Sequence, residues 1–208
     1  MRRTVLLVLA LVLIAGVAFG QAKKAPPGQA KKVASIESLA NPGELIATAG
    51  VGWGGLSGGA ELMLAQVKIA DLIPLTFGAG ARAFVDPGIF YSSFSTFSFG
   101  AGAFGTAHVG FKELKLPDGF RWLSNVDSYV GLGLGFASVS ATSYYSSYNI
   151  SPGIGISTFE GVSYYLNDKL ALTAEYGYIG SVKYTYSSFN ISTGWPLYYS
   201  TFGVTLKL

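Results

Sequence analysis

The chain has 208 residues and no cysteine; half of the residues are hydrophobic, 12% are charged and 28 are glycine. Such hydrophobicity excludes a disordered chain, and the missing cysteines exclude disulfide bonds, thiolate metal sites and a lipid-modified cysteine. A single histidine leaves little from which to build a zinc site, so we expect no metal and no other cofactor.

The net charge of +3 is unevenly distributed along the chain. Residues 1–36 contain six basic and no acidic side chains, so residues 37–208 carry a net charge of −3. The basic isoelectric point therefore belongs to the N-terminal arm. Nucleic-acid binding by the remainder of the chain has no support from this distribution.

Residues 1–22 have the three-part order of a secretory signal peptide. Two arginines precede an apolar run of 15 residues from Val5 to Phe19, and small residues follow it. The run is shorter than the roughly 20 residues of a membrane-spanning helix, so we expect cleavage after Gly20 or Ala22; the alternative is an uncleaved anchor. Residues 23–42, which are rich in lysine and proline, should form a periplasmic linker.

From residue 43 to residue 208, apolar residues alternate with small or polar ones, which is the period of a β-strand. Eight strands are expected, and six prolines fall between them, where a residue without an amide hydrogen does not interrupt a ladder. The expected strands cover residues 44–53, 59–69, 75–85, 97–111, 128–139, 153–165, 169–179 and 197–208.

The placement of charge favours a closed, up-and-down membrane barrel over a soluble sandwich. The apolar faces are nearly free of charge, as contact with hydrocarbon requires, because a Lys or Arg at the bilayer midplane costs roughly 2–4 kcal/mol. Glycines occupy much of the opposite faces, which suits the narrow interior of a barrel. The ionisable residues on those opposite faces are Glu61, Arg82, His108, Glu175 and Lys207, whereas Lys68 and Glu160 are exceptions.

Glu61, Arg82, His108 and Glu175 can form a polar network inside such a barrel. Desolvated charges must pair, because an unpaired one costs several kcal/mol, so we expect a structural plug; the alternative is an ion pathway. His108 on its own suggests a general base. No second imidazole accompanies it, and it lies near the periplasmic end of its strand, so we do not expect an enzyme.

The connections on one side of the expected sheet are mostly longer and rich in tyrosine and serine, and they cover residues 54–58, 87–96, 141–152 and 180–196. Their sequences repeat, with SSYNIS at residues 146–151 and SSFNIS at residues 187–192. We interpret them as external hairpins with an aromatic girdle at their base, and the alternative is an adhesive aromatic surface. The aromatic residues of interest there are Tyr91, Phe94, Tyr144, Tyr145, Tyr148, Tyr184, Tyr186 and Phe189.

The C-terminal part of the chain resembles a known family. The segment YYLNDKLALTAEYGYIG, Tyr164–Gly180, resembles the penultimate hairpin of small OmpA/OmpX-type outer-membrane barrels. The end, GVTLKL, is similar to the insertion signal of that superfamily through Gly203, Leu206 and Leu208, although Leu208 replaces the usual terminal aromatic. The resemblance implies a bacterial outer-membrane location, contact with outer-membrane lipid and a last strand that the barrel-assembly machinery reads.

Two functional hypotheses follow, together with a third of another class. The first is a structural or surface-interaction protein whose external loops meet a partner that the sequence does not identify. The second is a narrow, porin-like channel for small solutes or ions through the glycine-lined interior. The third is a secreted soluble barrel that carries an apolar ligand.

Overall fold

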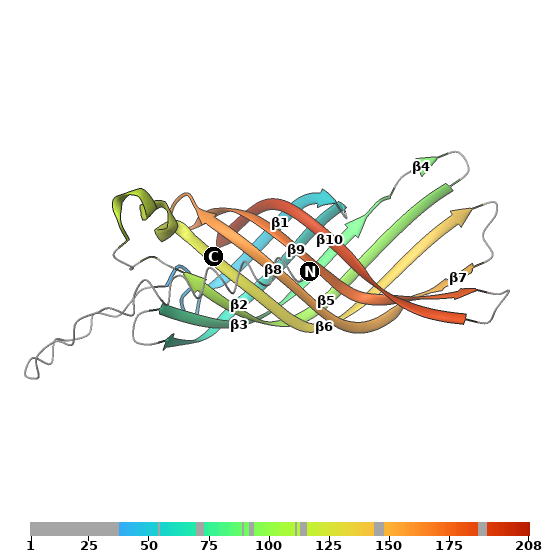
Figure 1. Ribbon diagram of the computed structural model, residues 1–208, viewed down its shortest axis with the longest axis horizontal. Coiled ribbons are helices and arrows are strands. Elements are labelled where there is room, and N and C mark those ends of the chain that lie inside the picture. The colour runs from blue at the N-terminus through green and yellow to red at the C-terminus, as the bar shows by residue number, and fades with distance from the viewer. Residues whose placement is uncertain are drawn as a thin grey trace, which may run out of the picture. The chain divides into compact units, whose positions relative to one another are not determined.

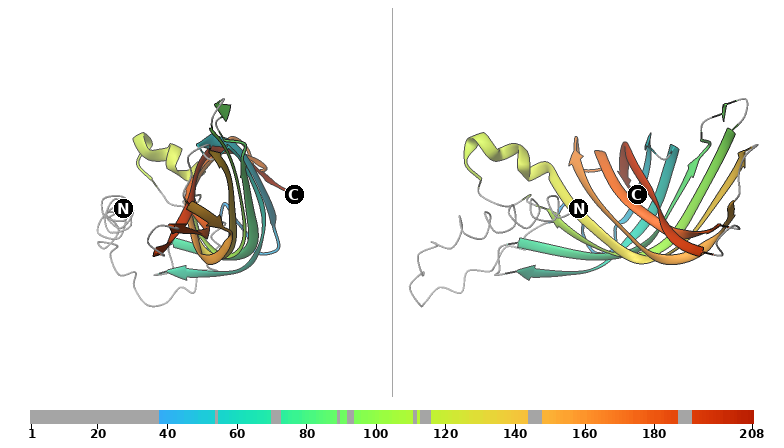
Figure 2. Two further views of the ribbon diagram at one scale, coloured as in Figure 1. Left: turned by 90° about the vertical axis from the view of Figure 1, so that its right-hand side faces the viewer. Right: turned by 45° about the vertical axis from the view of Figure 1, so that its right-hand side comes forward.

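In the computed structural model, the described part of the chain forms a closed antiparallel β-barrel (Figure 1). Eight strands pair in chain order and the last pairs with the first, so the sheet closes into the ring that Figure 2 shows along its long axis. The predicted all-β, eight-stranded barrel is therefore confirmed. The predicted signal peptide lies outside the described residues. These are 38–53, 55–69, 73–88, 90–91, 94–110, 112, 116–143, 148–186 and 191–208.

The elements of the described chain differ in length. The ring contains β1 (Leu45–Trp53), β2 (Gly55–Ile69), β3 (Ile73–Asp86), β5 (Phe94–Gly110), β6 (Val126–Ser143), β8 (Gly153–Tyr165), β9 (Leu170–Tyr186) and β10 (Ile191–Lys207). Outside the ring, β4 (Phe90–Tyr91) pairs with β5, and β7 (Tyr148–Ser151) pairs with β9. A 3₁₀-helix, η1 (Asp118–Asn125), lies between β5 and β6. Among the described residues no helix is long and apolar enough to cross a membrane.

The two ends of the barrel differ. One end, which we call the turn end, holds Glu44, the bend at residues 166–169 and Leu208. At the other, the hairpin end, β5, β6, β9 and β10 extend beyond the shorter β1 and β2 and carry β4 and β7 (Figure 1). The barrel therefore has a short, compact rim and a long rim built from extended hairpins.

The strand register shows how strongly the strands are staggered. Pairing from Thr48 of β1 through β2, β3, β5 and β6 leads to Gly155 of β8. Pairing from the same residue through β10 and β9 leads to Tyr165, ten residues further along β8. A stagger of this size requires a tilt of roughly 35–45°, and eight strands leave an interior just wide enough for side chains to fill.

Apolar and small residues alternate between outside and inside along every long strand. In β6, Leu132 and Leu134 are more than 60% exposed, whereas Gly131 and Gly135, which flank them, are buried. The other strands repeat the pattern, so an apolar belt surrounds the barrel. Further exposed members of this belt are Val51, Leu56, Leu62, Phe77, Val130, Ile154, Ile156, Val162, Leu172, Phe202 and Val204.

One irregularity in β2 explains the exceptional position of Lys68. Met63 pairs with Gly78 and Ala65 pairs with Phe77, so Leu64 is an extra residue that shifts the alternation by one. Beyond the bulge, Lys68 pairs with Pro74, which is buried on the inner side of β3. The prediction that Lys68 lies on the apolar face is wrong, because simple alternation does not anticipate an inserted residue.

A second irregularity lies between β9 and β10. Ile179 pairs with Leu197 and Ser181 pairs with Pro196, so Gly180 is the extra residue, and its φ of 65° is one that glycine adopts without strain. The predicted loop from Gly180 to Pro196 is wrong, because both strands continue past this bulge and pair as far as Tyr186 and Ile191.

Other predicted connections are also shorter than expected. Strand residues occupy parts of the predicted loops at 54–58, 87–96 and 141–152. Pro74 and Pro196 lie within β3 and β10, against the prediction that prolines separate the strands. Pro74 is the second residue of its strand and Pro196 adjoins the bulge, which are positions where a missing amide hydrogen does little harm.

Candidate functional site

The structure brings the four predicted interior residues together. Glu61, Arg82, His108 and Glu175 come from β2, β3, β5 and β9, and each is 5% exposed or less. They meet because each occupies an inward position of its strand and because the stagger places these positions at neighbouring levels of the ring. They form the centre of a polar network that we treat as the candidate site.

Arg82 joins the two glutamates. Its Nη2 lies 3.0 Å from Oε1 of Glu61, and its Nε lies 3.3 Å from Oε2 of Glu175. The guanidinium carbon also lies 4.8 Å from the ring centroid of Phe159, in cation–π geometry. Gly59 makes room for this arrangement, because a Cβ there would collide with the Arg82 side chain.

His108 extends the network toward the turn end. Its Nδ1 lies 2.8 Å from Oδ2 of Asp127, and its Nε2 lies 3.3 Å from Oε2 of Glu61. An ionised carboxylate only accepts hydrogen bonds, so both contacts are satisfied when the ring is a doubly protonated imidazolium. The geometry therefore supports a cationic His108 between two carboxylates.

Glu175 accepts two further hydrogen bonds from tyrosines. Tyr129 OH donates to its Oε2 at 3.0 Å, and Tyr199 OH donates to its Oε1 at 2.6 Å. Sequence reasoning missed both tyrosines and Asp127. A signal for Tyr129 was present, because it shares the inward phase of Gly131. Asp127 lay one residue before the expected start of its strand.

An aromatic layer fills the interior on the hairpin side of the network. Phe84 stacks on Tyr199 at a centroid distance of 5.4 Å, and Phe104 meets Phe159 edge to face at 4.9 Å. Several glycines exist to accommodate these rings: a Cβ at Gly100 would collide with Phe84, and one at Gly131 would collide with Phe159. The glycine-lined surface is therefore covered by large side chains from neighbouring strands. The layer consists of Phe84, Phe104, Tyr129, Phe159, Ile179 and Tyr199, with Leu197 against it.

The chain segment before β1 fills the interior at the turn end. Ser38, Leu39 and Ala40 are buried, and Thr76 Oγ1 donates a hydrogen bond of 2.7 Å to the carbonyl oxygen of Ala40. Leu39 packs with Tyr165 and Ala171, and Ala40 packs with Ile46 and Met63. All of these partners occupy inward positions. Residues 38–42, the described part of the predicted linker, thus lie against the barrel.

A ladder of hydroxyl groups lies between that segment and the network. Ser163, Thr173, Thr205 and Thr48 come from four adjoining strands, and successive oxygens are 2.8, 2.7 and 3.1 Å apart. Two atoms beside the ladder, Asp127 Oδ1 and Tyr165 OH, are buried without a hydrogen-bond partner in the described residues. Polar groups therefore continue below the network, within a filled interior.

Glu160 does face outward, as the alternation indicated. It pairs with Val130 of β6 and Tyr176 of β9, which are 51% and 45% exposed on the outer surface. The side chain is half-buried, and it has no ion pair or hydrogen bond with the described residues. A carboxylate therefore lies within the apolar belt.

The residues of the expected insertion signal occupy the last strand. Gly203 pairs with Gly50 on the inner side, where a Cβ would collide with the backbone of Ala49. Leu206 and Leu208 are exposed on the outer side at the turn end. Their placement gives β10 an apolar outer edge at its end.

The expected loop aromatics fall partly within strands. Tyr91 pairs with Phe94, and Tyr148 pairs with Tyr186, at the hairpin end. Tyr184 also belongs to β9 and pairs with Ile150. The remaining three residues, Tyr144, Tyr145 and Phe189, lie outside the described residues.

No family model matches the chain, and no curated protein matches it. Among solved structures, the chain is similar to the outer-membrane protein OprG from Pseudomonas aeruginosa, with 12% identity over 83% of this chain and 99% of that chain and a TM-score of 0.42. It is also similar to Neisserial surface protein A, with 20% identity over 79% and 94% of the two chains and a TM-score of 0.39. Similarity to the outer-membrane protein AlkL covers 90% and 97% of the chains, with 13% identity and a TM-score of 0.33. The barrel fold of this chain is established by its own strand pairing.

Proposed function

We propose that the protein is a closed, non-enzymatic barrel of the bacterial outer membrane whose hairpin end meets the surroundings of the cell. The turn end would face the periplasm. The observation that carries the proposal is the filled interior, where the aromatic layer, the charged network and the segment 38–40 follow one another along the barrel.

Membrane anchoring is supported by the outer surface. The apolar belt leaves large side chains such as Leu132 and Ile154 mostly exposed, which is unfavourable in water and favourable against lipid tails. Each of the eight described ring strands pairs with a neighbour on both sides, so the ring itself offers no free edge to hydrocarbon. A soluble carrier of an apolar ligand would instead place its apolar side chains inside, around a cavity.

A surface role is supported by the hairpin end. Strands β9 and β10 continue beyond the belt as a Tyr- and Thr-containing hairpin, with β7 added to its side. Replacing Tyr144, Tyr148 and Phe189 with serine should weaken binding to host, phage or neighbouring cells if this end is adhesive. Unchanged binding would leave a purely structural role.

A narrow channel is the second candidate, and one observation favours it. Among the described residues, the three buried carboxylates of Glu61, Asp127 and Glu175 form ion pairs with two basic side chains, Arg82 and His108, so one negative charge is in excess even when His108 is cationic. Together with the unpartnered atoms of Asp127 and Tyr165, this charge could attract cations into the interior.

Single-channel recording of the purified protein in planar bilayers distinguishes the two candidates. We expect no discrete conductance steps, because side chains of the described residues occupy the interior in each of these three layers. Discrete steps carried by cations would overturn the closed barrel and support the channel. Fractionation with outer-membrane detergent extracts and faster gel migration before boiling test the membrane location separately.

A further inference from the structure

The 3₁₀-helix η1 separates polar and apolar side chains. With three residues per turn, residues three apart share a face. Asp118, Arg121 and Ser124 form a polar face that is closed on itself: Arg121 Nη2 lies 2.6 Å from Asp118 Oδ1, and Ser124 Oγ donates to the carbonyl oxygen of Arg121 at 2.6 Å. Phe120 and Leu123 share a second face, and Trp122 lies on the third.

The apolar side chains of η1 are not covered by the barrel. Phe120 is 55% exposed, Trp122 is 54% exposed, and no residue of the helix is buried. An aromatic side chain contributes roughly 150–250 Å² when it is fully buried, so two of them leave a substantial apolar surface. Packing within the protein does not by itself explain these aromatics, because more than half of each one is left uncovered.

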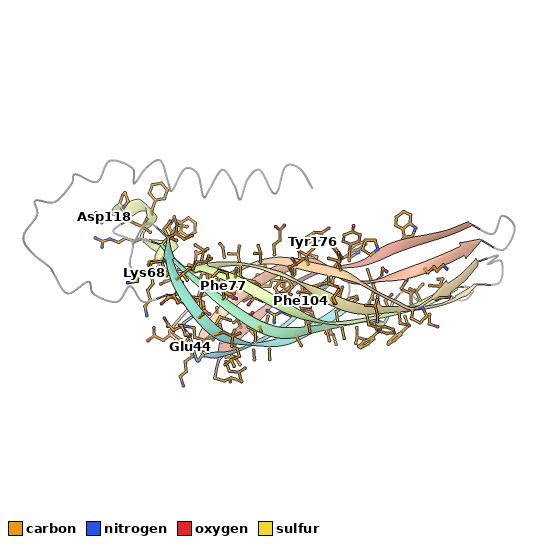
Figure 3. All side chains as sticks on the ribbon, turned by 90° about the horizontal axis from the view of Figure 1, so that it is seen from below. Glu44, Lys68, Phe77, Phe104, Asp118 and Tyr176 are labelled. Atoms are coloured by element: carbon orange, nitrogen blue, oxygen red, sulfur yellow. The ribbon has the colours of Figure 1, made fainter. Side chains whose placement is uncertain are left out.

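The position of η1 indicates what covers these aromatics. Val126 N–H donates to the carbonyl oxygen of Leu123, so the helix is joined directly to β6 without a linker. Val130, the first strongly exposed outward residue of β6, comes four residues later, about 13 Å along the strand. Strand tilt reduces this to roughly 10 Å along the barrel axis. Figure 3 shows Asp118 of η1 at the same end as Glu44 and Lys68.

We propose that η1 is an interfacial anchor that places Phe120 and Trp122 in the headgroup region of the periplasmic leaflet. This inference rests on the proposed membrane location. Tryptophan and arginine are favoured at this depth, because an aromatic body contacts the upper acyl chains while polar groups remain hydrated. The face formed by Asp118, Arg121 and Ser124 would point to water. The partner is a phospholipid surface, continuous with the lipid that surrounds the belt.

The tryptophans make the proposal directly measurable. The chain has three tryptophans. Trp53 is 88% exposed and lies at the end of β1 that points away from the turn end, so it is a matched reference for the other leaflet. One variant, Trp53→Phe with Trp195→Phe, retains only Trp122, and another, Trp122→Phe with Trp195→Phe, retains only Trp53. Both are reconstituted into phosphatidylethanolamine–phosphatidylglycerol vesicles that contain lipids brominated either near the glycerol or near the chain end.

We expect Trp122 to lose emission with the shallow bromines more than with the deep ones, and to be protected from aqueous acrylamide. Replacing Phe120 with serine in the Trp122-only variant should reduce this quenching. Quenching of Trp53 alone, with Trp122 open to acrylamide, would overturn the anchor while leaving the membrane location intact. Absence of quenching for both tryptophans would instead contradict the membrane location.

Discussion

At the residue scale, Arg82 connects the charges inside the barrel. Its two ion pairs, with Glu61 and with Glu175, are both buried, and removal of the cation leaves both carboxylates without this partner in a desolvated space. Breaking a buried ion pair by removing one partner costs about 3–5 kcal/mol. Arg82 therefore stabilises the fold because it neutralises carboxylates that are buried beside it.

Arg82→Met should lower the free energy of unfolding by about 3–5 kcal/mol, measured by urea titration of vesicle-reconstituted protein. Arg121→Met is the matched control, because Arg121 is 77% exposed in its pair with Asp118 and such pairs contribute about 1 kcal/mol at most. Adding Glu61→Gln and Glu175→Gln to Arg82→Met should restore part of the loss. Equal effects of the two arginine variants would show that the network is not desolvated.

Glu160 provides the opposite case, a charged group whose removal should stabilise the protein. It faces outward between Val130 and Tyr176, where an acid at mid-belt is unfavourable, although less so than the roughly 2–4 kcal/mol of a Lys or Arg. Glu160→Leu should therefore raise the stability in vesicles, whereas Asp168→Leu in the exposed turn should not. A destabilised Glu160→Leu variant would indicate that the carboxylate has a partner within the membrane.

An inward glycine that lies under an aromatic ring should tolerate substitution less well than a glycine on the outer face of the barrel. A Cβ at Gly131 would collide with the Phe159 ring, so Gly131→Ala should destabilise the barrel by about 1–3 kcal/mol. Gly105, on the paired strand, faces outward opposite the exposed Leu132 and has nothing closer than 4.0 Å, so Gly105→Ala should change stability by less than about 0.5 kcal/mol. Equal changes in the free energy of unfolding for the two variants would mean that the aromatic layer moves aside freely. That result would contradict the filled interior.

At the scale of elements, the belt-forming strands were predictable and their extensions were not. Contact with hydrocarbon forces alternation, so the phase of β3 or β6 could be derived from the sequence alone. Beyond the belt neither face needs to be apolar, and the continuation of β9 past Gly180 left no periodic signal. Its Tyr and Thr residues favour strands by propensity, but propensity alone does not give a register.

The candidate site likewise contains residues that could be predicted from the sequence and residues that could not. Glu61, Arg82 and Glu175 could be assigned to the interior because each interrupts an otherwise small or apolar pattern at a fixed phase. Asp127 could not, because its assignment depends on where a strand begins, and a boundary carries an error of a few residues. Lys68 was placed wrongly for a related reason, since a bulge changes the phase without changing the composition.

At the scale of the whole molecule, the described residues fill the interior in three layers in series: the aromatic layer, the charged network and the segment 38–40. Opening any one of these layers would leave the other two closed, so a single opened layer should not allow transport. The layers also differ in their physical basis, since packing, ion pairing and chain insertion respond to different substitutions.

Planar-bilayer recordings of three single-layer variants and their combination test this arrangement. Phe104→Ala in the aromatic layer, Arg82→Ser in the network and Leu39→Gly in the inserted segment should each remain without discrete conductance steps. Only the combined variant should conduct, and circular dichroism must show that it retains its strand content. A conducting Leu39→Gly variant would mean that the inserted segment alone closes the barrel, because water would then pass Arg82 and the aromatic layer unaided.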